Sequence, residues 1–142
     1  RKQVLTVVKK LKEYKGRSLG FLGLSFKGGT DDLRESPLVD LVEAMIGKGF
    51  AVKIYDKYVS IARLVGANKE YIEREIPHIS SLLCGSARDL VRGSDVVVVG
   101  NAGSDFREVL LSETREGQVV IDLVRILSGS DAIRGEYYGI SW

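Results

Sequence analysis

Hydrophobic residues recur along this chain with two different periods, which together predict alternating strands and helices. Short apolar runs and period-two alternation are typical of buried strands, whereas apolar residues three and four positions apart are typical of amphipathic helices. The first pattern predicts strands at 19–24, 51–55, 95–99, 118–121 and 137–140. The second predicts helices at 38–48 and near 58–66, 69–76, 86–92 and 105–112, with Pro77 as a break in the middle of the chain.

The segment from the first predicted strand to the second has the pattern of a β-α-β unit. Ser36 can cap the helix at 38–48 and Pro37 can occupy its first position, where no backbone N–H is needed. The run at 95–99 is apolar and β-branched, as in parallel strands that are buried on both faces. We therefore expect an α/β fold, a Rossmann-like open, mostly parallel sheet with helices on both faces.

The connection between the first strand and this helix, Ser25 to Ser36, is unusually long. It has twelve residues, about twice the two to six that are common for such loops. It leaves the carboxyl end of a predicted parallel strand, where open α/β sheets bind ligands, and it leads to a helix N-terminus, which favours anions. This position makes the loop the first candidate for a ligand site.

The composition of the loop suits the binding of phosphate. Lys27 offers a mobile ammonium group and Arg34 a planar fork, and Gly28 and Gly29 allow close approach of the backbone. The loop can equally be a surface segment stiffened by its own ion pairs, and composition alone does not decide between the two. The glycines do not form the G-x-G-x-x-G fingerprint of dinucleotide sites, so Asp56, after the second strand, is interpreted as a turn residue.

The sequence of this loop resembles that of a known family. The segment 23–37, GLSFKGGTDDLRESP, is similar to the signature of the UDP-glucose/GDP-mannose dehydrogenase family, in which it opens the C-terminal domain that binds the nucleotide sugar. Residues 66–73, 76–83 and 139–142 resemble the branch that acts on GDP-mannose. The resemblance extends over nearly the whole chain. Gly28 departs from it, since many members have alanine there.

This resemblance implies an activity and roles for individual residues. Such enzymes oxidise the C6 alcohol of the sugar to a carboxylate with NAD, through a covalent intermediate on a cysteine. The cysteine and the NAD-binding domain precede the domain that this chain resembles, so the chain alone is expected to be inactive. By motif position, Lys27 and Phe26 would contact the nucleotide sugar, and Arg34 would contact NAD. Arg125 lies near an arginine used by some UDP-glucose enzymes, and its role stays open.

The first 17 residues differ in charge from the rest of the chain. They contain seven basic residues and one acidic residue, which leaves 14 basic and 18 acidic residues in 18–142. Val4, Val7, Val8 and Leu11 recur at helical spacing within this segment. It can be a solvated helix or, as the resemblance implies, the end of a central helix that links two domains and forms a homodimer. We divide the chain into 1–17, the linking helix, and 18–142, the nucleotide-sugar-binding domain.

Composition excludes several other classes of protein. A net charge of +2 is too small for a strong nucleic-acid footprint, and the single cysteine and single histidine exclude a disulfide framework and a multi-histidine metal site. No apolar run approaches the ~18 residues of a membrane span. We expect a cytoplasmic setting. A stand-alone nucleotide-binding or regulatory module of the same fold remains the alternative to an enzyme domain.

Several other side chains have ordinary structural interpretations. Cys84 is interpreted as a packed thiol rather than a nucleophile, and His78 as a loop residue rather than a ligand or base. Asn101 follows a predicted strand at the ligand edge and can be a turn residue or a ligand contact. Trp142, with the tyrosines 137–138, is interpreted as part of a packed terminal strand.

Overall fold

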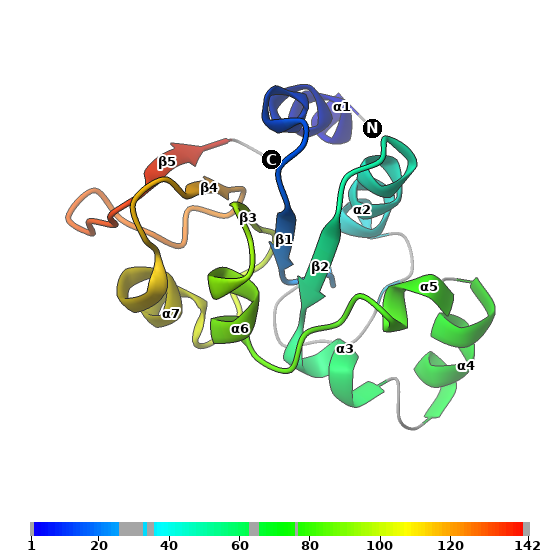
Figure 1. Ribbon diagram of the computed structural model, residues 1–142. Helices are drawn as coiled ribbons and strands as arrows, with labels where there is room; N and C mark the ends of the chain where they lie inside the picture. The colour runs from blue at the N-terminus through cyan, green and yellow to red at the C-terminus, as the bar shows by residue number, and fades with distance from the viewer. Residues whose placement is uncertain (1, 26–32, 34–35, 63–65, 76, 141–142) are drawn as a thin grey trace.

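Five parallel strands form the centre of the computed structural model (Figure 1). The structure describes residues 2–25, 33, 36–62, 66–75 and 77–140. The strands lie in the order β2-β1-β3-β4-β5. Their bounds are β1 Leu19–Leu22, β2 Val52–Tyr55, β3 Val96–Val99, β4 Val119–Asp122 and β5 Glu136–Gly139. All four strand pairs are parallel, which confirms the predicted α/β fold and makes the sheet wholly parallel.

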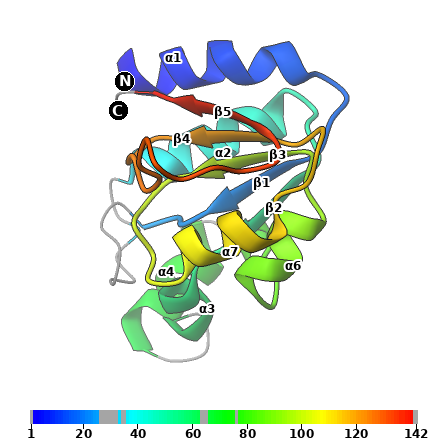
Figure 2. The same cartoon turned by 90° about the vertical axis from the view of Figure 1, so that its left-hand side faces the viewer.

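Helices connect β1 to β2, β2 to β3 and β3 to β4, and they cover both faces of the sheet (Figure 2). Their bounds are α1 Lys2–Leu11, the 3-10 turn η1 Lys12–Tyr14, α2 Pro37–Gly47, α3 Lys57–Ala62, α4 Gly66–Glu75, α5 Pro77–Ser80, α6 Ala87–Arg92 and α7 Phe106–Glu113. Helices α1 and α2 lie on one face of the sheet, and α6 and α7 lie on the other. None of the helices in these ranges is long and apolar enough to cross a membrane.

The two faces of β1 contribute to two separate hydrophobic cores. Leu19 and Phe21 pack in the core that includes α1 and α2, whereas Leu22 packs in the core that includes α6 and α7. Successive residues of a strand point to opposite faces, so a run that is apolar at every position is needed to fill both cores. This requirement accounts for the apolar run of β3, in which all four valines are buried.

Helix α1 is part of the folded domain. Val7, Val8 and Leu11 are buried on the face that packs against α2 and the sheet, while Leu5 on the other side is 69% exposed. The interpretation as a solvated helix therefore holds for one side only, because the other side packs in the hydrophobic core. Whether the helix also links two domains is not tested by the structure and stays a prediction.

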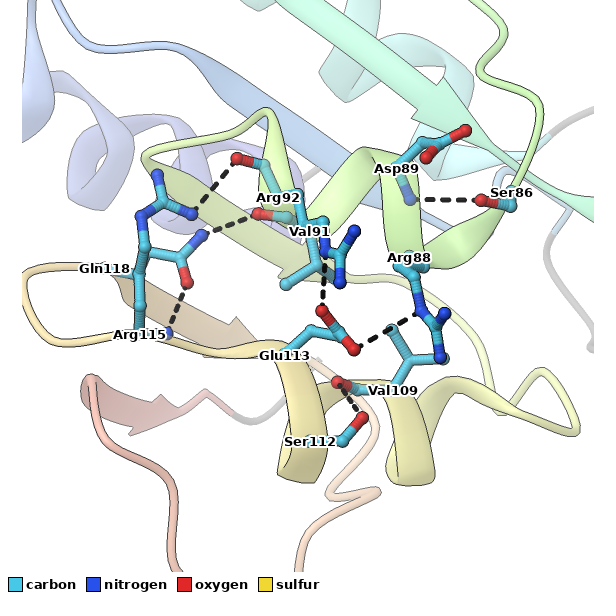
Figure 3. Close-up of polar contacts among 10 residues, drawn as sticks. All are labelled: Ser86, Arg88, Asp89, Val91, Arg92, Val109, Ser112, Glu113, Arg115 and Gln118. Carbon is cyan, nitrogen blue, oxygen red and sulfur yellow. Dashed lines mark hydrogen bonds and ion pairs between the residues drawn. The ribbon is translucent and has the colours of Figure 1, made fainter.

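Polar contacts fix the ends of α6 and α7 at the amino edge of the sheet (Figure 3). The buried Gln118 amide donates hydrogen bonds to the carbonyl oxygens of Val91 and Ser94, 2.6 and 2.7 Å away. On the surface, the Glu113 carboxylate lies between the guanidinium groups of Arg88 and Arg92, at 3.3 and 2.7 Å. These contacts join α6 to the chain that enters β4, at the opposite edge of the sheet from the long loop.

The middle of the chain contains the main departure from the predicted elements. As predicted, helical structure ends before Pro77, since α4 stops at Glu75. Pro77 then begins the short helix α5, which the sequence did not predict, since proline is well tolerated at a first helical position. His78 was interpreted as a loop residue, which is wrong. It lies in α5, where its ring nitrogen is 2.7 Å from Oε1 of Glu43 on α2.

Candidate functional site

The carboxyl ends of β1 and β3 lie side by side, and the connections that leave them run to opposite sides of the sheet. From β1 the chain runs through α2 to β2 on one side, and from β3 it runs through α7 to β4 on the other. Open α/β sheets bind ligands at such a switch point, outside the carboxyl ends of the strands. The loop that follows β1 therefore starts at the position expected of a ligand site.

Two glycines let the backbones approach closely at this point. Gly23 has a φ of +93°, a conformation that other residues rarely adopt, and a Cβ there would overlap the amide group of Asn101. A Cβ on Gly100 would lie 2.8 Å from the carbonyl oxygen of Gly23. The ends of the two strands are therefore packed backbone against backbone, and Asn101 fills the space beside Gly23.

A buried carboxylate, Asp56, joins the ends of three strands. Its Oδ2 accepts hydrogen bonds from the backbone N–H groups of Leu24 and Ser25, at 2.8 and 3.2 Å, and from the Ser25 hydroxyl at 3.3 Å. Its Oδ1 accepts from the N–H groups of Tyr58 and Val59 at the start of α3. All of these donors point at the two oxygens of the carboxyl group, which act only as acceptors in this network.

The Asn101 amide completes the network from the end of β3. Its Nδ2 donates to the carbonyl oxygen of Ser25 at 3.0 Å and lies 3.3 Å from Oδ2 of Asp56. Asn101 and Asp56 are each only 4% exposed. The sequence placed both side chains at the right edge of the sheet but interpreted Asp56 as a turn residue. Its contacts with Leu24 and Ser25, more than 30 residues earlier in the chain, have no local sequence signal.

The other end of the loop is fastened to the same place. Leu33 is 2% exposed and packs in the core that includes α2. Ser36 caps α2 by accepting the N–H of Leu38, as predicted, and its hydroxyl also donates to the carbonyl oxygen of Leu24 at 2.8 Å. Leu24 is thus bonded on its N–H side to Asp56 and on its carbonyl side to Ser36.

A small hollow opens beside this network between the starts of α3 and α7. It is lined by Asp56, Lys57, Tyr58, Asn101, Gly103, Ser104, Asp105 and Phe106. Neighbouring Tyr55 is half-buried, and burial, together with the carboxylates of Asp105 and Asp56, raises the pKa of its hydroxyl. The hydroxyl therefore stays protonated at neutral pH. The described part of this edge offers oriented binding groups rather than an activated nucleophile.

The three site residues implied by the resemblance, Phe26, Lys27 and Arg34, lie outside the described residues. Arg125 is described, and it is exposed near the start of the segment that follows β4, with a φ of +56°. Its guanidinium donates to the carbonyl oxygen of Gly139 at 3.3 Å, which gives it a structural partner in β5. Arg125 therefore does not join the Asp56 network.

Cys84 has the features of a structural thiol. It is a free, half-buried cysteine whose backbone N–H donates to Ile54 on β2 at 2.7 Å. Burial raises the pKa of its thiol, which disfavours the thiolate form that a nucleophile needs. Within the ranges that the structure covers, no group of three or more His, Cys, Asp or Glu side chains could hold a metal ion.

The described residues do not form a cradle for a dinucleotide. In dinucleotide-binding domains, glycines after the first strand leave room for the pyrophosphate. Here the space beside Gly20 is filled by Ser94 and Leu90, and the space beside Gly23 is filled by Asn101. The first helical N–H groups of α2 are partly satisfied by Ser36.

Comparison with known proteins identifies the family. The profile of the UDP-glucose/GDP-mannose dehydrogenase family, UDP binding domain, matches residues 20–129. The chain therefore belongs to this family and contains its UDP binding domain. It is 48% identical over 140 residues to GDP-mannose 6-dehydrogenase from Pseudomonas syringae pv. syringae, and 29% identical over 133 residues to UDP-glucose 6-dehydrogenase from Rickettsia prowazekii.

The solved structures agree with this assignment. The chain resembles the crystal structure of a ternary complex of GDP-mannose dehydrogenase from Pseudomonas aeruginosa, with 45% identity and a TM-score of 0.85. The match covers 96% of this chain and 31% of that one. The chain likewise spans about a third, 32%, of the Pseudomonas syringae relative. The fold is thus that of one domain of a longer dehydrogenase.

Proposed function

We propose that this chain is the nucleotide-sugar-binding domain of an NAD-dependent GDP-mannose 6-dehydrogenase, which oxidises GDP-mannose to GDP-mannuronate. The observation that carries the proposal is the 48% identity to a GDP-mannose 6-dehydrogenase over 99% of the chain. The identity to a UDP-glucose enzyme is 29%. A difference of this size favours GDP-mannose over a UDP-sugar as the substrate.

Within this proposal, the long loop supplies the groups that touch ligand. Lys27 binds the nucleotide sugar, with Phe26 beside it, and Arg34 reaches the NAD. The fastening of both loop ends at the carboxyl edge of the sheet supports this role, because binding groups need a rigid base. The NAD-binding domain and the catalytic cysteine would belong to other parts of the longer protein. Residues 1–17 would link this domain to those parts, and the whole protein would form a homo-oligomer.

The proposed setting is the cytoplasm. Cys84 is a free thiol in this structure, which fits a reducing compartment. The nucleotide sugar, the NAD and the remaining parts of the same enzyme are the partners that the proposal requires.

The activity can be tested on the whole protein that contains this domain. We expect reduction of NAD with GDP-mannose and much slower reduction with UDP-glucose, followed by the absorbance of NADH. Lys27→Ala should raise the KM for GDP-mannose, and Arg34→Ala should act mainly on the KM for NAD. A clear preference for UDP-glucose would transfer the assignment to the UDP-sugar branch. Binding of nucleotide without NAD reduction would favour the alternative, a nucleotide-binding regulatory module.

A further inference from the structure

The entry of the long loop is held by more hydrogen bonds than the local secondary structure requires. An aspartate at the start of a helix needs to accept only from the first free N–H groups. Oδ1 of Asp56 does this for α3 through Tyr58 and Val59. The second oxygen, Oδ2, is not needed for the helix, and it accepts hydrogen bonds from Leu24, Ser25 and Asn101.

We propose that Asp56 and Asn101 are positioning residues, which fix the direction in which the chain leaves β1 and so place Lys27 against the nucleotide sugar. This inference rests on the proposed function. Ser25, the last residue held by the network, is two positions before Lys27. Consecutive Cα atoms are only about 3.8 Å apart, so a change in the backbone direction at Ser25 would displace Lys27.

Asn101 contributes to this positioning from the neighbouring strand. Its amide bonds to the carbonyl oxygen of Ser25 at 3.0 Å, while Asp56 accepts the N–H of the same residue at 3.2 Å. Both backbone polar groups of Ser25 are thus held by side chains that follow β2 and β3, and Ser25 itself is fully buried. This arrangement leaves the peptide plane of Ser25 little freedom to rotate.

The far end of the loop is bonded to Leu24, the residue before Ser25. The Ser36 hydroxyl donates to the carbonyl oxygen of Leu24, whose N–H is bound to Asp56. These contacts hold the two ends of the loop together at the carboxyl edge before any ligand binds. Fixing the base of a binding loop in advance supports affinity as well as orientation.

Asp56→Asn in the whole protein is the direct test. Both carboxylate oxygens accept hydrogen bonds, so an amide in either orientation would point its NH2 group at backbone donors. We expect the Kd for GDP-mannose, measured by calorimetry, to rise about tenfold or more, because a small misplacement of a binding group is costly. The KM for GDP-mannose should rise with it, and kcat should change less. Asn101→Ala, which removes donors but leaves the carboxylate, serves as the second variant if Asp56→Asn does not fold.

Asp95→Asn provides a matched control. Oδ2 of Asp95 accepts the backbone N–H and the hydroxyl of Ser18 at 3.0 and 3.2 Å, which is the same set of contacts that Asp56 makes with Ser25. These contacts lie at the amino edge of the sheet, so the control should leave the Kd unchanged. A Kd that rises equally in Asp95→Asn would show general loosening of the domain and overturn the positioning role.

Lys27→Ala separates failure of this inference from failure of the proposed function. If Lys27→Ala weakens binding of GDP-mannose while Asp56→Asn and Asn101→Ala both leave the Kd unchanged, the positioning role is wrong and the proposed function stands. If the unmodified protein does not bind GDP-mannose, or Lys27→Ala leaves the Kd unchanged, the proposed role of the loop itself is wrong.

Discussion

At the scale of single residues, buried side chains at the ends of strands hold the connections that follow them. Asp56 does this after β2, and Asp122 does it after β4. The Asp122 carboxylate accepts the N–H groups of Val124 and Leu127 at 3.1 and 3.2 Å, and the hydroxyl of Tyr137 at 2.9 Å. At the carboxyl edge of the sheet, aspartate side chains thus accept the hydrogen bonds of backbone N–H groups that have no backbone partner.

Tyr137 should make stability depend on pH in the alkaline range. Its burial and its hydrogen bond to Asp122 raise the pKa of its hydroxyl from 10.0 to about 12. Because the folded pKa is higher than the unfolded one, the stabilising contribution is complete below pH 10 and is lost as the pH rises to about 12. We expect the free energy of unfolding, measured with denaturant, to fall more steeply over this range in the unmodified protein than in Tyr137→Phe. Identical slopes would contradict the role of this hydroxyl.

The residues of the site were only partly predictable from the sequence. The charges of Lys27 and Arg34 marked the loop as a candidate, because composition is a local property. The role of Asp56 could not be read in this way, because its donors Leu24 and Asn101 are 32 and 45 residues distant in the chain. Nothing near Asp56 distinguishes a buried network from an ordinary turn.

At the scale of elements, local signals placed the boundaries well. Ser36 and Pro37 marked the start of α2, and the structure confirms both the cap and the proline at the first position. The short helix that begins at Pro77 was not predicted, because proline ends a helix when it is internal but begins one when it comes first. The choice depends on where the preceding helix stops, and α4 stops at Glu75.

Removal of the Ser36 hydroxyl should lower the free energy of unfolding more than removal of an ordinary helix cap does. Ser36 is 2% exposed and bonds both to the N–H of Leu38 and to the carbonyl oxygen of Leu24. We expect Ser36→Ala to lower the free energy of unfolding by about 2 kcal/mol, since it loses the cap and leaves a buried carbonyl oxygen without this donor. Urea denaturation of the purified domain would measure the change.

Ser86→Ala is the matched control for this prediction. Ser86 caps α6 through the N–H of Asp89 at 3.0 Å, at an exposed site. Its loss should therefore cost about 1 kcal/mol or less. Equal losses in the two variants would mean that the bond to Leu24 contributes nothing to stability.

At the scale of the whole molecule, the basic segment 1–17 packs against the rest of the domain through buried apolar side chains of α1. We expect Leu11→Ala to destabilise the domain by about 2–5 kcal/mol, because the side chain is fully buried against α2 and the sheet. Leu5→Ala, on the same helix but 69% exposed, should leave the thermal midpoint almost unchanged. A small effect of Leu11→Ala would show that α1 is not part of the cooperative domain.

Charged groups on the surface of the domain have a more modest role. Arg88 and Arg92 share the Glu113 carboxylate beside α6 and α7, but both arginine side chains are about 60% exposed. Exposed ion pairs contribute little, roughly 1 kcal/mol or less each. The two hydrophobic cores, rather than these pairs, hold the helices against the sheet.

The sequence by itself determined the alternation of strands and helices, the start of α2 and the position of the candidate loop. Each of these depends on residues that are close together in the chain, such as Ser36 and Pro37. Only the tertiary structure decided which distant groups meet at the carboxyl edge, where Asp56 and Asn101 enclose the entry of the loop. Burial turns these polar side chains into obligatory partners for the backbone, and burial is a property of the whole fold.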